Sequence, residues 1–142
     1  MFDVTTVVFC EKILQLMDSR YQLIGPYPNQ VMFPMSSGTH LQLDVFCMIR
    51  IREAGDRHVF GKFINTDGSE HAFSVPVSAP APNHTIQMAM GGVTFGINRP
   101  GEIVVMLGDD KNDLQEAGRL SVLIPHTVVS GAGLTEPGVL IS

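Results

Sequence analysis

The stretch "THLQLDVFCMIRIRE", residues 39–53, constrains the fold more than any other part of the sequence. Apolar and polar side chains alternate along it, which is the pattern of a long β-strand with one buried face. The apolar positions are Leu41, Leu43, Val45, Cys47, Ile49 and Ile51, and the polar positions are Gln42, Asp44, Arg50 and Arg52. The sequence therefore predicts a long strand with a continuous inward face.

Two apolar residues, Phe46 and Met48, interrupt the polar face of this strand. Large contiguous apolar patches are rarely left exposed on a monomeric protein. We therefore expect a loop, the tail of the chain or a partner to cover this part of the outer face, and Phe46 and Met48 are candidate binding residues.

The next segment, "HVFGKFINTDGSEHAFSVPV", predicts a β-hairpin about Asp67-Gly68, because this dipeptide supplies the positive φ angles of a tight two-residue turn. That turn places Ile64 opposite His71 and His58 opposite Val77, so that the two histidines do not face each other. The proline-rich "SAPAPNH" then predicts an extended crossover between two sheets.

Residues 84–98 and the two segments that follow complete the strand pattern. Apolar side chains fall on even numbers up to Met90 and on odd numbers from Val93, which predicts a β-bulge at Gly91-Gly92. "IVVMLG" is apolar at odd-numbered and even-numbered positions alike, so both faces of this strand are expected to be covered. "RLSVLIP" is expected to point Leu120, Val122 and Ile124 inward.

The opening segment "FCEKILQLMDSRYQLIGPY" fits either an amphipathic helix or a strand, turn and strand. The helix lacks an N-cap residue before it and a glycine after it. A turn at Asp18-Ser19 pairs Leu16 with Tyr21 and Leu14 with Leu23, which gathers apolar side chains on one face. We favour the hairpin, and the helix stays the alternative.

Composition and length agree with an all-β chain. Of the 142 residues 44% are hydrophobic and only 16% charged, against roughly 25% in an average domain, and 14 glycines and 9 prolines mark frequent turns. We predict one domain over residues 1–125, an antiparallel β-sandwich of about eight strands, followed by a Gly-rich C-terminal tail at 126–142.

The run "VVFCEKILQLMDSRYQLIGPYPNQVMFP" carries a resemblance through Cys10, Glu11, Leu23, Ile24, Gly25, Tyr27 and Pro34. Together with "RPGEIVVMLGDD" and "AGRLSVLI" it resembles an uncharacterised bacterial family, a domain-of-unknown-function group, over about residues 4 to 125. The resemblance implies a compact antiparallel β-sandwich of about eight strands and no activity. Pro26 and the tail depart from the family pattern.

Charge and hydropathy indicate which kind of partner and which cellular compartment to expect. The net charge is −5, the pI is about 5.4, and the nine Lys and Arg are scattered, so a nucleic-acid partner is not expected. The first residues lack the basic region of a signal peptide, and no apolar run is long enough to cross a membrane. We expect a cytoplasmic protein whose Cys10 and Cys47 are buried thiols.

Three carboxylates, Asp109, Asp110 and Asp113, form the densest acidic cluster and are candidate calcium ligands. Their spacing is not that of an EF-hand, and a solvated turn that keeps this end of the molecule soluble is the preferred interpretation. The histidines show no metal-ligand spacing, and no serine or cysteine nucleophile motif occurs. An enzyme built from residues far apart in the sequence stays open, because catalytic triads are defined by geometry.

The tail contains a β-prone segment, Val139, Leu140 and Ile141, after a Gly-rich stretch. Such a segment can add to an open sheet edge of its own chain or of a neighbour, or it can be a disordered end. We expect a non-catalytic β-sandwich that binds a protein partner or itself as a homo-oligomer, with no cofactor. The alternative is a module that binds a small ligand or calcium through its acidic end loops.

Overall fold

The computed structural model describes residues 2–32 and 40–124, and these residues form an all-β structure of nine strands with no helix. The strand count exceeds the predicted eight by one. The strands are β1 (Phe2–Gln15), β2 (Tyr21–Tyr27), β3 (Gln30–Met32), β4 (His40–Ile51), β5 (Gly55–Ile64), β6 (Glu70–Ala79), β7 (His84–Gly96), β8 (Gly101–Gly108) and β9 (Gln115–Leu123).

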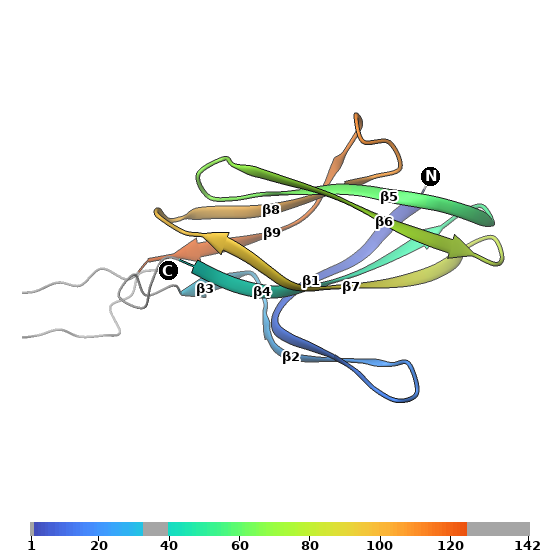
Figure 1. The fold of residues 1–142 in the computed structure, drawn as a ribbon, viewed down its shortest axis with the longest axis horizontal. Coiled ribbons are helices and arrows are strands. Elements are labelled where there is room, and N and C mark those ends of the chain that lie inside the picture. Colours follow the sequence, from blue (N-terminus) through green and yellow to red (C-terminus); the bar gives the residue numbers. More distant parts are fainter. Residues whose placement is uncertain (1, 33–39, 125–142) are drawn as a thin grey trace, which may run out of the picture.

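The strands form two sheets, and Figure 1 shows β5, β6, β8 and β9 above β4 and β7. One sheet has the order β2-β1-β4-β7 and the other the order β3-β9-β8-β5-β6. Among the described strands all pairs are antiparallel except β3 with β9, which run parallel, so the expectation of a purely antiparallel structure is wrong at this short strand. The described part of the chain contains no helix of the length and apolar character that a membrane crossing requires.

A single core lies between the sheets and draws side chains from both. The alternation in β4 is confirmed, since its inward residues from Leu41 to Ile51 are buried. The ring of Phe63 on β5 meets the ring of Phe95 on β7 edge to face, with centroids 5.7 Å apart, and so joins the two layers. Because the hydrophobic effect rewards burial of apolar area, this alternation determines which face of each strand points inward.

Strand β8 is less completely covered than its sequence suggested. Ile103, Val105 and Leu107 are buried, whereas Val104 and Met106 are only half-buried. The strand therefore has one core face and one partly exposed face. In β9, Leu120 and Val122 are fully buried as expected, and Ile124 packs partly buried against the core.

Both predicted hairpins exist, but each is shifted by one residue from its predicted register. Ile64 pairs with Glu70 rather than His71, and Gln15 pairs with Tyr21 where Leu16 was expected. In each case a three-residue loop replaces the predicted two-residue turn, with Ser19 and Gly68 at positive φ as its last residue. The helical alternative for the opening segment is wrong, because these residues form β1 and β2. In the second hairpin His58 faces Pro76 and His71 faces Phe63, so the two histidines do not face each other, as expected.

The predicted bulge in β7 is confirmed. The pairing with β4 runs from Leu43 and Val93 directly to Val45 and Met90, which leaves Asp44 opposite Gly91 and Gly92. Gly92 has a φ of +69°, the left-handed conformation that glycine adopts without strain. The bulge ends the regular part of β7 at Met90.

Candidate interaction surface

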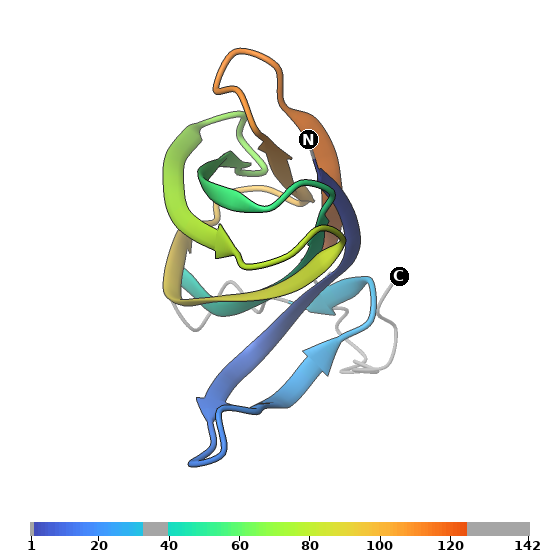
Figure 2. The same cartoon turned by 90° about the vertical axis from the view of Figure 1, so that its right-hand side faces the viewer.

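The feature that departs most from a plain two-layer structure is a projecting hairpin, residues 11–24, which we call the arm. Strand β1 pairs with β4 only as far as Cys10, opposite Asp44, and its remaining residues pair with β2 alone. Figures 1 and 2 show the arm, in blue, leaving the two layers at an angle. It is held to the rest of the molecule at its base and along one face.

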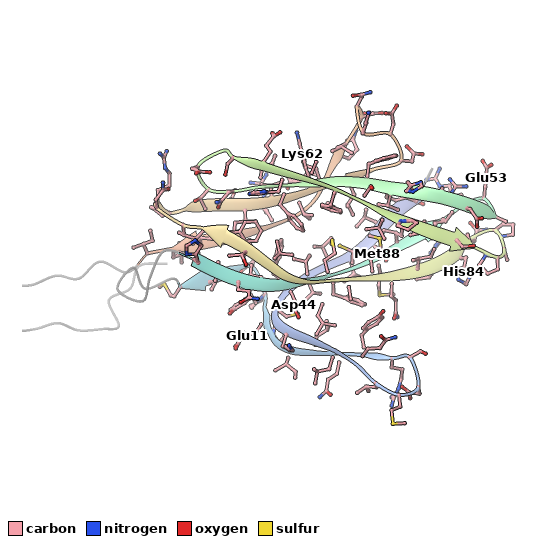
Figure 3. All side chains as sticks on the ribbon, in the orientation of Figure 1. Glu11, Asp44, Glu53, Lys62, His84 and Met88 are labelled. Carbon is pink, nitrogen blue, oxygen red and sulfur yellow. The ribbon has the colours of Figure 1, made fainter. Side chains whose placement is uncertain are left out.

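Asp44 anchors the base of the arm. Its Oδ2 accepts a hydrogen bond from the backbone nitrogen of Ile13 at 2.7 Å, and its Oδ1 accepts one from the backbone nitrogen of Gly92 at 2.8 Å. Although the carboxylate belongs to the polar face of β4, it is buried, and Figure 3 shows it between the sheet and the arm. One side chain therefore ties β1 and the bulge of β7 to β4.

The inner face of the arm covers the outer face of β4. The ring of Tyr21 lies against the ring of Phe46, with centroids 5.8 Å apart, and Phe46 is only 7% exposed. Met48 is half-buried. We expected a loop, the tail or a partner to cover Phe46 and Met48. A hairpin of the same chain covers Phe46, so Phe46 is not available as a docking surface.

The outer face of the arm is exposed and partly apolar. In the described residues the exposed large hydrophobic side chains are Leu14 at 38%, Ile24 at 40% and Met17 at 106% of their full accessible area. The register places Leu14 opposite Gln22 and Ile24 opposite Lys12 on one face, while Met17 lies in the loop at the tip. Every large apolar side chain that the described structure leaves in water is therefore on the arm.

A second exposed feature is the edge of β7, with which no further strand of residues 2–32 and 40–124 pairs. Proteins usually protect sheet edges with charges, proline, bulges or short strands. Of the four edge strands formed by the described residues, β2 contains Pro26, β3 has three residues, and β6 contains Glu70 and Pro76. β7 contains neither a charged residue nor a proline, and its bulge leaves His84–Met90 as a regular, unprotected stretch.

A groove of about 600 Å³ runs along this unprotected stretch of β7. Its walls are residues 84–90 of β7, residues 75–78 of β6, and Gln15, Ser19 and Tyr21 of the arm. Both the inward and the outward residues of β7 line it, so the groove exposes the strand edge-on. The tip of the arm therefore lies beside the open edge of β7.

The part of the groove between the sheets is apolar. Ile86 and Met90 of β7 and Val75 of β6 are half-buried and pack against the core, whereas Met88 points between the layers and is 5% exposed. The outward residues Thr85, Gln87 and Ala89 are exposed and uncharged. An extended segment placed here would find a row of backbone groups and an apolar floor, which are the requirements for strand addition.

The predicted calcium ligands lie in the loop between β8 and β9. Asp110 Oδ1 accepts a hydrogen bond from the backbone nitrogen of Asn112 at 3.0 Å, and its carbonyl accepts one from the nitrogen of Asp113 at 3.0 Å, as in an ordinary turn. Within residues 2–32 and 40–124, no three carboxylate, imidazole or thiol side chains are grouped as a metal ion requires. The structure does not bring Asp109, Asp110 and Asp113 together as one ligand set.

The cysteines lack the environment of a nucleophile. Burial raises the pKa of the Cys47 thiol to about 12. Burial also raises the pKa of Cys10, with a smaller contribution from the carboxylate of Asp44. A reactive cysteine requires a lowered pKa, so both thiols stay protonated near neutral pH. The other candidate binding residues, Val139, Leu140 and Ile141, lie outside the described residues.

Comparison of the chain with known proteins identifies no matching protein-family model and no matching curated protein. The fold is similar to part of a solved β-glucosidase from Erythrobacter marinus, with 18% identity and a TM-score of 0.44. The match covers 87% of this chain and 15% of the glucosidase chain, so this chain spans about a seventh of that protein's length.

Sequence reasoning missed both the arm and the open edge of β7. The sequence shows that residues 84–96 carry no charge. This predicts an unprotected sheet edge only once the topology is known to place that strand at an edge. Leu14 and Ile24 fit the apolar pattern of a covered hairpin, and only the departure of β1 from β4 exposes them.

Proposed function

We propose that this protein is a non-catalytic protein-interaction module, a β-sandwich that associates with a second copy of itself through the open edge of β7. The observation that carries the proposal is the seven-residue stretch His84–Met90, an edge without charge or proline beside an apolar-floored groove. An exposed edge of this kind is a template for another strand.

Charge makes the edge of β7 the part of the surface where a second copy is least opposed. The chain carries a net charge of −5, so two copies repel each other over most of their surfaces. Contact along β7 brings no charged side chain of that strand into the interface. Antiparallel pairing of two β7 strands joins the two four-stranded sheets into one continuous sheet around a two-fold axis, the commonest symmetry of soluble oligomers.

The stretch His84–Met90 is centred on Gln87, and this residue provides the test. If the two-fold axis passes near it, Gln87→Lys places two like charges opposite each other, which destabilises a strand pair. We expect the dissociation constant of the dimer to rise at least about tenfold, equivalent to about 1.4 kcal/mol. The measurement is light scattering coupled to size exclusion over a range of concentrations.

Gln42→Lys is the matched control, because Gln42 is also exposed on the same sheet but belongs to β4, whose edges are both paired. It should leave the dimer unchanged. Deletion of residues 134–142 distinguishes the other occupant: if the dimer is lost on this deletion although β7 is unaltered, the strand that pairs is the tail and not a second β7. A monomeric mass at all concentrations for the unaltered chain overturns the proposal.

A further inference from the structure

We infer that His84 makes the pairing of two copies along β7 depend on pH: the neutral imidazole permits pairing, and protonation of the imidazole dissociates the two copies. This inference rests on the proposed function and adds a form of regulation to the same site. It starts from the composition of the groove. Of the described residues that line the groove, only His84 has a side chain of the type that changes charge between about pH 5 and 8.

His84 lies on the apolar side of its strand. Side chains alternate between the two faces of β7, so His84 shares the inward face with Ile86, Met88 and Met90. Met88 is buried and the other three side chains are half-buried, whereas the outward residues of this stretch are exposed. The imidazole is therefore a polar group at the end of an apolar row.

Pairing along β7 covers this imidazole with apolar side chains. With the two-fold axis at Gln87, His84 of one copy pairs with Met90 of the second copy, and Ile86 pairs with Met88. Paired residues of antiparallel strands have their side chains on the same face and in contact. Because a two-fold contact repeats every pair, one such histidine lies at each end of the seam.

The two charge states of the imidazole respond differently to this cover. Burial disfavours the charged form of a side chain, and a charge without a partner in an apolar contact is costly. Protonation also gives β7 the kind of charge by which edge strands normally avoid pairing. Acid is therefore expected to weaken the dimer at both ends of the seam.

The charged groups on the same sheet do not offset this cost. The register places Arg50 and Arg52 on either side of the β4 residue that pairs with His84. Arg52 forms an ion pair with Asp3, with Nη2 2.7 Å from Oδ1, so this carboxylate is already engaged. The nearest charges on β4 are thus cationic or paired, and neither kind stabilises a second cation.

The elements across the groove do not offset it either. Residues 75–78 of β6 are uncharged, and behind them on β5 the Asp56 carboxylate accepts a hydrogen bond of 2.7 Å from a hydroxyl of β6. Arg57 donates from Nη2 to the carbonyl of Glu53 at 3.1 Å. The arm adds one phenol and an ion pair at its tip, from Tyr21, Asp18 and Arg20. In residues 2–32 and 40–124 no carboxylate forms an ion pair with the imidazole.

The dissociation constant of the dimer at pH 8 and pH 6 tests the inference, in light scattering coupled to size exclusion. We expect the constant to rise at least about fivefold from pH 8 to pH 6, because the two copies take up protons as they separate. The overall charge predicts the opposite change. Lowering the pH toward the pI of about 5.4 reduces the net charge and the repulsion between two copies.

Three variants assign the effect to one residue. His84→Gln keeps a polar side chain that does not take up a proton, so its dissociation constant should not rise from pH 8 to pH 6. His84→Lys is charged at both pH values and should weaken the dimer at pH 8 at least as much as acid weakens the unaltered dimer. His58→Gln is the matched control, since His58 is exposed on β5 in the other sheet, and it should retain the full pH dependence. Circular dichroism at both pH values checks that each variant is folded.

The outcomes separate the regulation from the pairing itself. If Gln87→Lys dissociates the dimer but the constant of the unaltered chain falls or stays level from pH 8 to pH 6, the role of His84 is wrong and the pairing of β7 stands. The same conclusion follows if His84→Gln shows the rise of the unaltered chain, because another group then titrates. A chain that is monomeric at both pH values and at all concentrations fails the pairing and its regulation together.

Discussion

The side chain of Asp44 holds the backbone of Ile13 at the point where β1 leaves the sheet, through a hydrogen bond of 2.7 Å from the nitrogen of Ile13 to Oδ2. The second oxygen receives the nitrogen of Gly92 in the bulge of β7. A polar residue on the outward face of β4 thus holds two irregularities at once: the point where the arm leaves the sheet and the bulge that ends the regular edge.

Removal of this carboxylate should destabilise the fold. Hydrogen bonds to charged groups contribute about 1.5–3 kcal/mol each, and Asp44→Ala leaves two backbone donors without their acceptor. We expect the free energy of unfolding to fall by about 3 kcal/mol in urea titrations. Asp56→Ala, which removes an exposed acceptor of the Ser78 hydroxyl, should change it by less than about 1 kcal/mol. Equal effects of the two substitutions would contradict the anchoring role of Asp44.

The two glycines of the bulge should differ in their tolerance of a side chain. Gly92 has a φ of +69°, and an added Cβ would meet Gln42 at an ordinary 3.6 Å, so Gly92→Ala is disfavoured by conformation rather than by space. We expect a loss of about 1–2 kcal/mol. Gly91 has no positive φ, and an added Cβ would meet the carboxyl group of Asp44 at an ordinary 3.7 Å, so Gly91→Ala should stay within about 0.5 kcal/mol. Thermal and urea unfolding measure both, and the reverse order of stability would disprove this assignment of the bulge.

The hairpins show how far the sequence determines register. Asp18-Ser19 and Asp67-Gly68 correctly marked the turns, because these residues tolerate the backbone angles that reverse the chain. The number of loop residues was wrong by one in both cases. In each hairpin the first loop-flanking residue, Leu16 or Asn65, donates its nitrogen to the carbonyl four positions on, and Ser19 or Gly68 completes the loop at positive φ. Asp-Gly and Asp-Ser are compatible with two-residue and three-residue loops, so local sequence alone does not choose between them.

The bulge at Gly91-Gly92 was predictable for the opposite reason. A change of parity between Met90 and Val93 has to be absorbed by an extra residue wherever the strand lies in the sheet. The arm had no such signal, because the residues around Cys10, "VVFCEKIL", do not alternate regularly and so offer no break that would mark where β1 leaves β4. Whether Ile13 pairs with β4 or only with β2 depends on Asp44, 31 residues away, and contacts of that separation are not encoded in a local pattern.

Cys47 should make the stability of the protein depend on pH in the alkaline range. Burial raises the pKa of its thiol from the ordinary 9.0 to about 12 in the folded chain. Below pH 9 the thiol is protonated in both states and contributes no pH dependence. Between about pH 9 and 12 the unfolded chain releases this proton while the folded chain keeps it. Rising pH therefore favours unfolding, at about 1.4 kcal/mol per pH unit for this group.

Cys47→Ala isolates this contribution, because tyrosine and lysine side chains titrate in the same range in both proteins. The substitution creates a small cavity in the core and should lower stability by a constant amount at all pH values. The free energy of unfolding should then fall less steeply for Cys47→Ala than for the unaltered chain between pH 9 and 11, in urea titrations under reducing conditions. Parallel curves would show that the folded thiol ionises as easily as the unfolded one. Water would then reach the inward face of β4 at this position, although Cys47 is fully buried between the two sheets.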